Sequence, residues 1–266
     1  MSALLTYEPW IRLGAFGTVL LAMMLLERLA PRRVLAVPRA WRWSNNLALV
    51  IIDTLLARAV LPVAAVGTAL LAAEADWGLF NRLDLRLAWS IPLTLLALDF
   101  TVWAQHVLFH RVPVLWRLHR VHHADIEIDA STGLRFHPLE IILSMLIKIA
   151  VVLALGAPAV AVLAFEVLLN ATSLFNHSNL RLPPRLDGGL RSLVVTPDMH
   201  RVHHSWNPEE TDSNFGFNLS VWDRLFGTYR AEPREGHEKM TIGLHEFRDL
   251  GDLRLDRMLL QPFRDR

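Results

Sequence analysis

The sequence predicts an all-α, polytopic membrane protein with about three spans, one helical hairpin and a cytoplasmic, histidine-rich helical cap. Two observations carry this prediction. The chain of 266 residues is 53% hydrophobic, with a mean hydropathy of +0.31, and both values are high for a soluble domain. Its apolar residues also form four tracts of the length that a bilayer requires, and soluble helices seldom supply several such tracts. A soluble all-helical protein with an apolar core is therefore the less favoured alternative.

The first two apolar tracts, 12–30 and 47–73, are predicted to be anchoring spans. The first has about the twenty residues that a helix needs to cross a bilayer, and the second is interrupted at Arg58 and Pro62. The N-terminus lacks the basic region and the small-residue cleavage site of a signal peptide. We therefore interpret residues 1–86 as membrane-anchor spans or as walls of a substrate channel.

The third and fourth tracts are predicted to bring the chain twice to the same side of the membrane. The third, 87–109, is a span that runs directly into the first histidines. The fourth, 139–175, is too long for one helix and carries LGAP at Leu155–Pro158, which is a turn signal. We expect a hairpin that returns to the side from which it entered, followed from about residue 180 by a polar cap without a further span.

An arginine-rich loop between the first two tracts predicts the orientation. Short loops rich in arginine stay in the cytoplasm, and this loop contains Arg32, Arg33, Arg39 and Arg42. The N-terminus is therefore expected outside. The third tract and the hairpin then both place their histidine-rich ends at the cytoplasmic face of a multi-pass membrane protein.

The composition restricts the chemistry. The chain has no cysteine, which excludes disulfides, thiolate zinc sites, cysteine-ligated iron–sulfur clusters and cysteine nucleophiles. A net charge of +1 gives no indication of a nucleic-acid partner. Any metal must be bound by nitrogen and oxygen ligands, and twelve histidines are available.

Three histidine motifs predict a metal site. HVLFH places two imidazoles one helical turn apart, and HRVHH, which occurs twice, places histidines at i, i+3 and i+4. Eight imidazoles exceed the three protein ligands that are usual for a catalytic zinc, and they suit two metal ions with open positions. The eight predicted ligands are His106, His110, His119, His122, His123, His200, His203 and His204.

Four other histidines receive separate predictions. His177, where the hairpin re-emerges, is predicted to be a further ligand. His137 precedes the hairpin, and three roles stay open for it: a ligand, a hydrogen-bond donor behind a ligand, or an interfacial residue. His237 and His245 lie in the charged C-terminal segment and are expected to be solvated.

Two aspartates are predicted to support the site, and no separate acid or base is assigned. Asp198 either accepts an N–H from a ligand histidine or belongs to a helix start with Thr196 as N-cap and Pro197 as the first residue. The helix start is the preferred interpretation. Asp223 is expected either to pair with Arg224 or to attach the cap to the histidine helices.

The histidine motifs together resemble the fatty acid hydroxylase/sterol desaturase superfamily of integral-membrane di-iron enzymes. The strings RFHPLE (135–140), FNHSN (175–179), TPDMHRVHHS (196–205) and NFGFNLSVWDRLFGTY (214–229) strengthen the resemblance, which covers about 92–230. It implies two iron ions held by the eight motif histidines, with His177 matching an additional histidine of the family. It also implies O2 as co-substrate and a lipid-like substrate that is hydroxylated or desaturated.

The resemblance suggests three segments: anchor spans at 1–86, a catalytic domain at 87–230 and a polar C-terminal tail at 231–266. The substrate class stays open among fatty acyl, sterol, ether lipid and carotenoid. No haem- or flavin-binding domain is fused to the chain, so a separate electron-transfer protein is expected. Arg185, Arg191 and Arg230 either dock that donor or contact anionic lipid headgroups.

A metal transporter and a non-catalytic scaffold are the two alternatives to an enzyme. A membrane metal transporter would distribute ligands along a path near the midplane, whereas these motifs gather at one face. A non-catalytic membrane scaffold would leave the motifs incomplete, and they are complete. The sequence therefore favours an oxidoreductase, and it does not indicate an oligomeric state.

Overall fold

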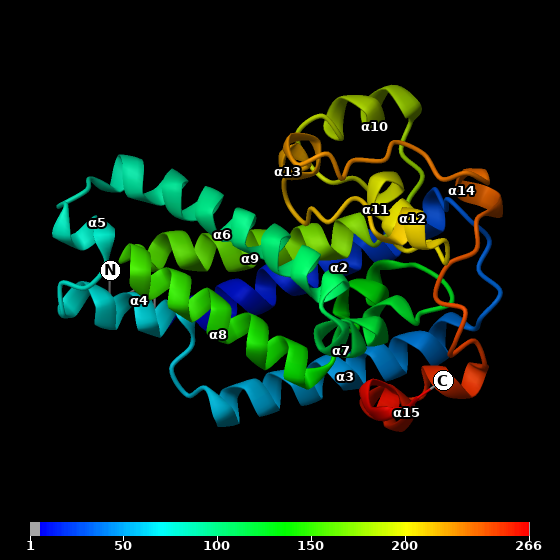
Figure 1. Ribbon diagram of the computed structural model, residues 1–266, viewed down its shortest axis with the longest axis horizontal. Helices are drawn as coiled ribbons and strands as arrows, with labels where there is room; N and C mark the ends of the chain where they lie inside the picture. Colours follow the sequence, from blue (N-terminus) through cyan, green and yellow to red (C-terminus); the bar gives the residue numbers. More distant parts are fainter. Residues whose placement is uncertain (1–5, 266) are drawn as a thin grey trace.

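The computed structural model describes residues 6–265, and within this range the chain is all-helical without a β-strand (Figure 1). Five segments are long and apolar enough to cross a membrane: Glu8–Leu29, Arg39–Arg82, Leu87–Arg111, Pro138–Leu155 and Ala159–Asn176. These are the three predicted spans and the two arms of the predicted hairpin. The predicted fold class is therefore confirmed, and the chain is an integral membrane protein.

The first two spans are antiparallel. Helix α2 is Glu8–Leu29 and helix α3 is Arg39–Val60. Helix α3 continues through Arg58 and ends just before Pro62. The proline ring removes a backbone donor and disfavours a helical conformation of the residue before it. Helix α4 (Ala65–Glu74) and the short α5 (Leu79–Arg82) then lead to the third span.

The third span turns sharply into the first HRVHH helix. Helix α6 is Leu87–Arg111 and helix α7 is Pro113–His123, joined at Val112. Pro113 ends the first helix and is favourable as the first residue of the second. Because the connection is so short, the two histidine motifs of these helices face each other.

The hairpin consists of α8 (Pro138–Leu155) and α9 (Ala159–Asn176). Gly156 makes the turn with a φ of +64°, and a Cβ at this position would lie 2.6 Å from the carbonyl oxygen of Trp77. Only glycine fits both the left-handed backbone and the close approach. The turn predicted from LGAP is thus confirmed.

The bundle has two different ends. Helix α2 packs on α9, α3 and α4 pack on α8, and α6 packs on both arms of the hairpin. The hairpin turn, α4 and α5 lie at one end, and α7 lies with the C-terminal cap at the other (Figure 1). Every histidine motif is therefore at the same end of the bundle.

The cap follows the hairpin and closes over this end. It contains only short elements: α10 (Pro184–Leu190), α11 (Pro197–His203), α12 (Pro208–Thr211), α13 (Val221–Leu225), α14 (Gly236–Lys239), η2 (Leu250–Leu253), α15 (Leu255–Leu260) and η3 (Gln261–Phe263). Another 3-10 turn, η1 (Ala130–Leu134), lies between α7 and α8. The segment expected to be a polar tail is packed, because Met258 is buried against Leu49 of α3 and Val121 of α7.

The loop arginines that predicted the orientation bind acids within the fold. Arg42 is 1% exposed and lies 2.8 Å from an Asp125 oxygen and 2.6 Å from an Asp129 oxygen. Arg32 lies 3.2 Å from Asp198 of α11. These ion pairs fasten the N-terminal helices to the histidine end of the bundle.

Candidate metal centre

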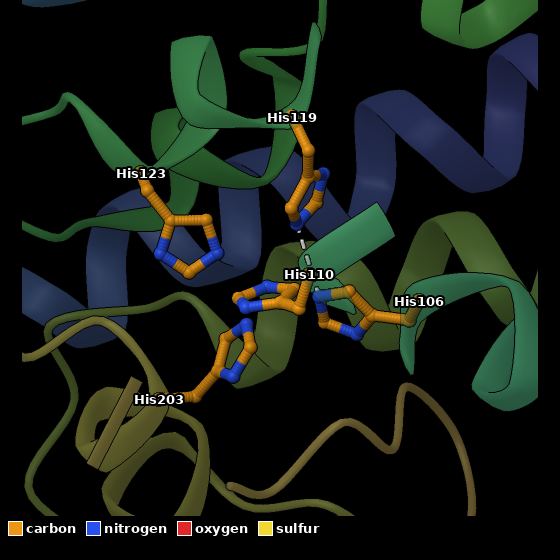
Figure 2. Close-up of side chains that lie close together, drawn as sticks. All are labelled: His106, His110, His119, His123 and His203. Carbon is orange, nitrogen blue, oxygen red and sulfur yellow. Dashed lines mark hydrogen bonds between the residues drawn. The ribbon is translucent and has the colours of Figure 1, made fainter. Parts of the chain in front are cut away.

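Nine histidines converge at the capped end of the bundle and form two groups. One ring nitrogen of each histidine lies within 4.8 Å of the corresponding nitrogens of its own group. The first group is His106, His110, His119, His123 and His203, and Figure 2 shows their rings turned toward one another. The second group is His122, His177, His200 and His204. All eight motif histidines and His177 are thus brought together.

The two HRVHH motifs each contribute to both groups. On α7, His119 and His123 belong to the first group, while His122, between them in sequence, belongs to the second. On α11, His203 belongs to the first group, and His200 and His204, one turn apart, belong to the second. The i, i+3, i+4 spacing therefore lets one short helix reach two neighbouring sites.

Five of the nine imidazoles are oriented by a hydrogen bond at Nδ1, which leaves Nε2 to face the group. One of these bonds joins His110 to an Asp212 carboxylate oxygen at 3.3 Å, and the other four are shorter. The four bonds are 2.7 Å long, and they join His106 to the Phe215 carbonyl, His203 to the Ser213 carbonyl, His177 to the Ser173 carbonyl and His119 to a Glu140 carboxylate oxygen. The facing nitrogens meet closely, since Nε2 of His106 and Nε2 of His119 are 3.0 Å apart (Figure 2).

Several other ring nitrogens are buried without a partner in the described part of the chain, among them Nε2 of His110, His123 and His203 and both nitrogens of His204. An unpartnered buried nitrogen is unfavourable. Burial lowers the pKa of His119 to about 3, and it holds the pKa of His200 well below its ordinary value. These rings are therefore neutral, which is the form that binds a metal ion, so the residues present fit two metal sites.

Asp223 attaches the cap to the histidine helices. Its carboxylate accepts from the backbone N–H of Phe215 and of Gly216, both at 2.8 Å, and from the indole N–H of Trp103 on α6 at 3.1 Å. Because the Phe215 carbonyl accepts from His106, Asp223 holds the backbone that orients this imidazole. Arg224 does not pair with it but lies over the ring of Tyr229.

The structure places Asp198 and His237 away from the nine rings. The Thr196 side chain caps α11, and Asp198 lies in the first turn of this helix. Asp198 pairs with Arg32 instead of a ligand histidine. The preferred interpretation, in which Asp198 belongs to a helix start, therefore describes its position. His237 was expected to be solvated, and this expectation is wrong. It is 4% exposed and lies 2.9 Å from a Glu232 oxygen.

His137 and His245 also lie outside both groups. His137 caps α8, because its Nδ1 accepts the backbone N–H of Leu139 and its Nε2 lies 3.2 Å from the Leu259 carbonyl oxygen. Both ring nitrogens of His137 have a hydrogen-bond partner, so in this structure His137 caps a helix and is not placed as a metal ligand. His245 is exposed, as expected, and stacks on Trp206.

Glu140 is the site residue that the sequence reasoning missed. It lies in RFHPLE, at the start of an apolar helix, and it is 3% exposed. A carboxylate that enters a membrane helix beside a histidine motif is a functional candidate by default. The acidic residue at the start of this apolar helix is thus a signal that the sequence carries for Glu140.

A cavity of about 610 Å³ reaches the first histidine group, a volume typical of a small-molecule site. His106 and His119 line its inner end, and residues of α2, α3, α6, α8 and α9 form its walls. The exposed lining residues Pro9, Thr54 and Arg58 belong to the start of α2 and the second half of α3. The cavity is therefore open to the outside of the bundle beside these parts of α2 and α3.

Comparisons with known proteins match the part of the chain that contains these histidines. The model of the fatty acid hydroxylase family matches residues 91–228. An ornithine lipid hydroxylase of Rhizobium tropici is 30% identical over 56% of this chain and 44% of its own length. The human alkylglycerol monooxygenase is 33% identical over 64% of this chain and 36% of its own.

A cholesterol 25-hydroxylase-like protein of Danio rerio is 28% identical over 56% of the chain and 58% of its own length. The chain thus spans less than half of the first relatives that it matches. No solved structure matches it. Since the family model covers just over half of the chain, including every histidine of the two groups, the chain belongs to the fatty acid hydroxylase family, within the fatty acid hydroxylase/sterol desaturase superfamily.

Proposed function

We propose that this chain is a membrane-bound, O2-dependent lipid oxygenase in which the nine histidines hold two iron ions. The observation that carries the proposal is the pair of buried, neutral imidazole groups, the first of which borders a cavity between the membrane helices. The relatives are named as hydroxylases and monooxygenases of lipids, which favours hydroxylation over desaturation here.

The donor set fits this assignment. Nitrogen-only ligands are compatible with iron, zinc, copper and nickel, and the family resemblance favours iron. When bound, the two irons would supply the O2-dependent oxidation of an unactivated C–H bond, which side chains alone cannot perform. The chain's own part is to hold the imidazoles, through Glu140 and the Phe215, Ser213 and Ser173 carbonyls, and to present a lipid from the bilayer.

The same arrangement weighs against a metal transporter. A transporter needs ligands in succession along a path through the membrane, whereas these nine rings form two compact groups at one end of the bundle. A separate electron-transfer protein would dock on the cap. Arg185 is exposed and available for an acidic donor, while Arg191 is taken up internally, since it donates to the Ala231 carbonyl at 2.8 Å.

The decisive experiment is the metal content of the detergent-purified chain after reconstitution with ferrous iron. We expect about two irons per chain, Mössbauer spectra of a coupled pair, and a hydroxylated lipid that carries one oxygen atom from labelled O2. A chain that binds no stoichiometric metal after reconstitution would exclude this function.

Glu140→Gln is expected to lower iron affinity or turnover by about 10- to 100-fold, the usual effect of removing the partner of a ligand histidine. The amide keeps the size of the side chain but lacks the charge that stabilises the Nδ1–H of His119. Iron titration with a chelator measures the affinity. Glu238→Gln is the matched control, because Glu238 is exposed on the cap and pairs only with Arg32; equal losses in both variants would contradict the role of Glu140.

The proposed cytoplasmic position of the cap predicts a labelling pattern. Because the sequence has no cysteine, the variant Arg185→Cys carries a single thiol on an exposed residue of α10. An impermeant maleimide should label this thiol in inverted membrane vesicles and not in intact cells. Labelling in intact cells would place the cap, and the histidine site with it, on the opposite side.

A further inference from the structure

The buried polar groups that line the cavity differ in whether they have a hydrogen-bond partner. Lys148 lies 2.8 Å from Glu166, which also pairs with Arg12, and Gln105 donates to Ser144 at 2.7 Å. Asp53 also lines the cavity, from α3. Within residues 6–265, neither of its carboxyl oxygens has a hydrogen-bond partner.

The Asp53 carboxyl is buried, with 4% of the residue exposed. An unsatisfied carboxyl in this position makes the folded protein less stable. It contributes to none of the ion pairs that fasten α3 to the rest of the bundle. Such a group in a cavity wall requires an explanation, and a ligand that supplies the missing hydrogen bond is the direct one.

Asp53 lies near the histidines. It is close enough to Glu140 for the two carboxyl groups to interact. One oxygen of Glu140 bonds His119 at 2.7 Å, and the other has no partner among the described residues. The unpartnered oxygens of Asp53 and Glu140 therefore belong to the same cavity wall as His119.

The remaining wall shows how a lipid would lie. The cavity extends from the histidines along apolar side chains, including Leu98, Val102 and Phe165, to the opening beside α2 and α3. Asp53 lies in the second half of α3, which packs against α8. A lipid that binds with its polar end at Asp53 can place its tail along these apolar side chains.

We propose that Asp53 binds a hydroxyl group of the lipid substrate. The substrate class is then a long-chain lipid alcohol. A neutral hydroxyl suits the site because it adds no charge to a wall that already carries both signs, with Arg12 and Lys148 paired to Glu166. That the lipid alcohol is a substrate rests on the proposed function, whereas its binding at Asp53 does not.

The test compares photoreactive probes on the full chain in nanodiscs: diazirine-tagged hexadecanol, its methyl ether and the corresponding amine. Competition with untagged lipid gives the relative affinities. The wild-type chain should bind the alcohol about tenfold more tightly than the methyl ether, as expected for one buried hydrogen bond. Asp53→Asn should reduce that preference for the alcohol to less than about twofold. In both proteins the probes should label peptides from the cavity walls.

Thr54→Val is the matched control, because Thr54 also lines the cavity but its hydroxyl already donates to the Val50 carbonyl at 2.8 Å. It should keep the preference for the alcohol. The melting temperature of Asp53→Asn should equal or exceed that of the wild type, because the replaced group is unsatisfied. A lower melting temperature would assign the carboxyl a structural role and overturn the proposal.

The same measurements are made on metal-free and on iron-loaded protein. A hydroxyl preference that depends on Asp53 in both forms supports this inference, even if iron loading yields no oxygenase activity. Equal binding of alcohol and ether, a preference that Asp53→Asn retains, tighter binding of the amine, or no binding of any probe would each overturn it, even if the iron and the activity are found.

Discussion

Replacing His203 with alanine is expected to remove about one of two bound irons per chain. It should also lower lipid hydroxylation by more than about a hundredfold, which exceeds the usual loss when a residue that hydrogen-bonds a ligand histidine is replaced. His203 faces the first group, and its Nδ1 is already fixed by the Ser213 carbonyl. Its Nε2 has no other partner in the described residues. Elemental analysis and product assays measure the two effects.

His122→Ala and His204→Ala should give the same result at the second group, because each motif helix serves both groups. The control is His245→Ala, which removes an exposed ring that only stacks on Trp206. It should retain the iron and the activity of the wild type. Full metal content in His203→Ala would refute the assignment of the first group.

Arg42→Met is expected to lower the free energy of unfolding by about 3–5 kcal/mol, because removing one partner of a buried ion pair leaves uncompensated charges. The Arg42 guanidinium binds Asp125 through two hydrogen bonds, of 2.9 and 2.8 Å, and Asp129 through one of 2.6 Å. Arg42 also donates a hydrogen bond to the Thr132 hydroxyl in η1. The midpoint of thermal unfolding in detergent reports the loss.

The triple variant Arg42→Met, Asp125→Asn, Asp129→Asn should recover part of that stability, because it removes the opposing charges together with the arginine. Arg254→Met serves as the exposed comparison. Arg254 pairs with Asp256 at the surface, so its replacement should change stability by no more than about 0.5 kcal/mol. A similar midpoint for Arg42→Met and the wild type would show that the buried pair contributes nothing.

Local features of the sequence were sufficient to predict the spans and the hairpin. A span is recognisable because the bilayer imposes one length and one polarity on it, and the hairpin turn is recognisable because Gly156 alone tolerates the backbone there. The motif histidines were equally readable, since i, i+3 and i+4 positions share a helix face. His177 was found through its place at the end of the hairpin and through the family resemblance.

The same local reasoning failed where a side chain meets a partner distant in the sequence. His137 has a histidine's full coordinating ability, but Leu259 occupies it from the far end of the chain. His237 lies in a charged segment, yet the cap folds over it. The sequence used Arg42 only as a loop charge that indicates orientation, whereas the structure buries it beside Asp125 and Asp129.

The sequence by itself determined the spans, the hairpin, the family and the set of histidines, because each depends on composition or on spacing within one helix. Only the tertiary structure decided how nine histidines divide into two groups, that Glu140 and Asp223 orient them, and that Asp53 is left unpaired in a cavity beside them. Those facts depend on how α3, α6, α7, α8 and α11 pack against one another. Spacing along the chain does not encode that packing, because it joins residues from different helices, such as His119 of α7 and Glu140 of α8.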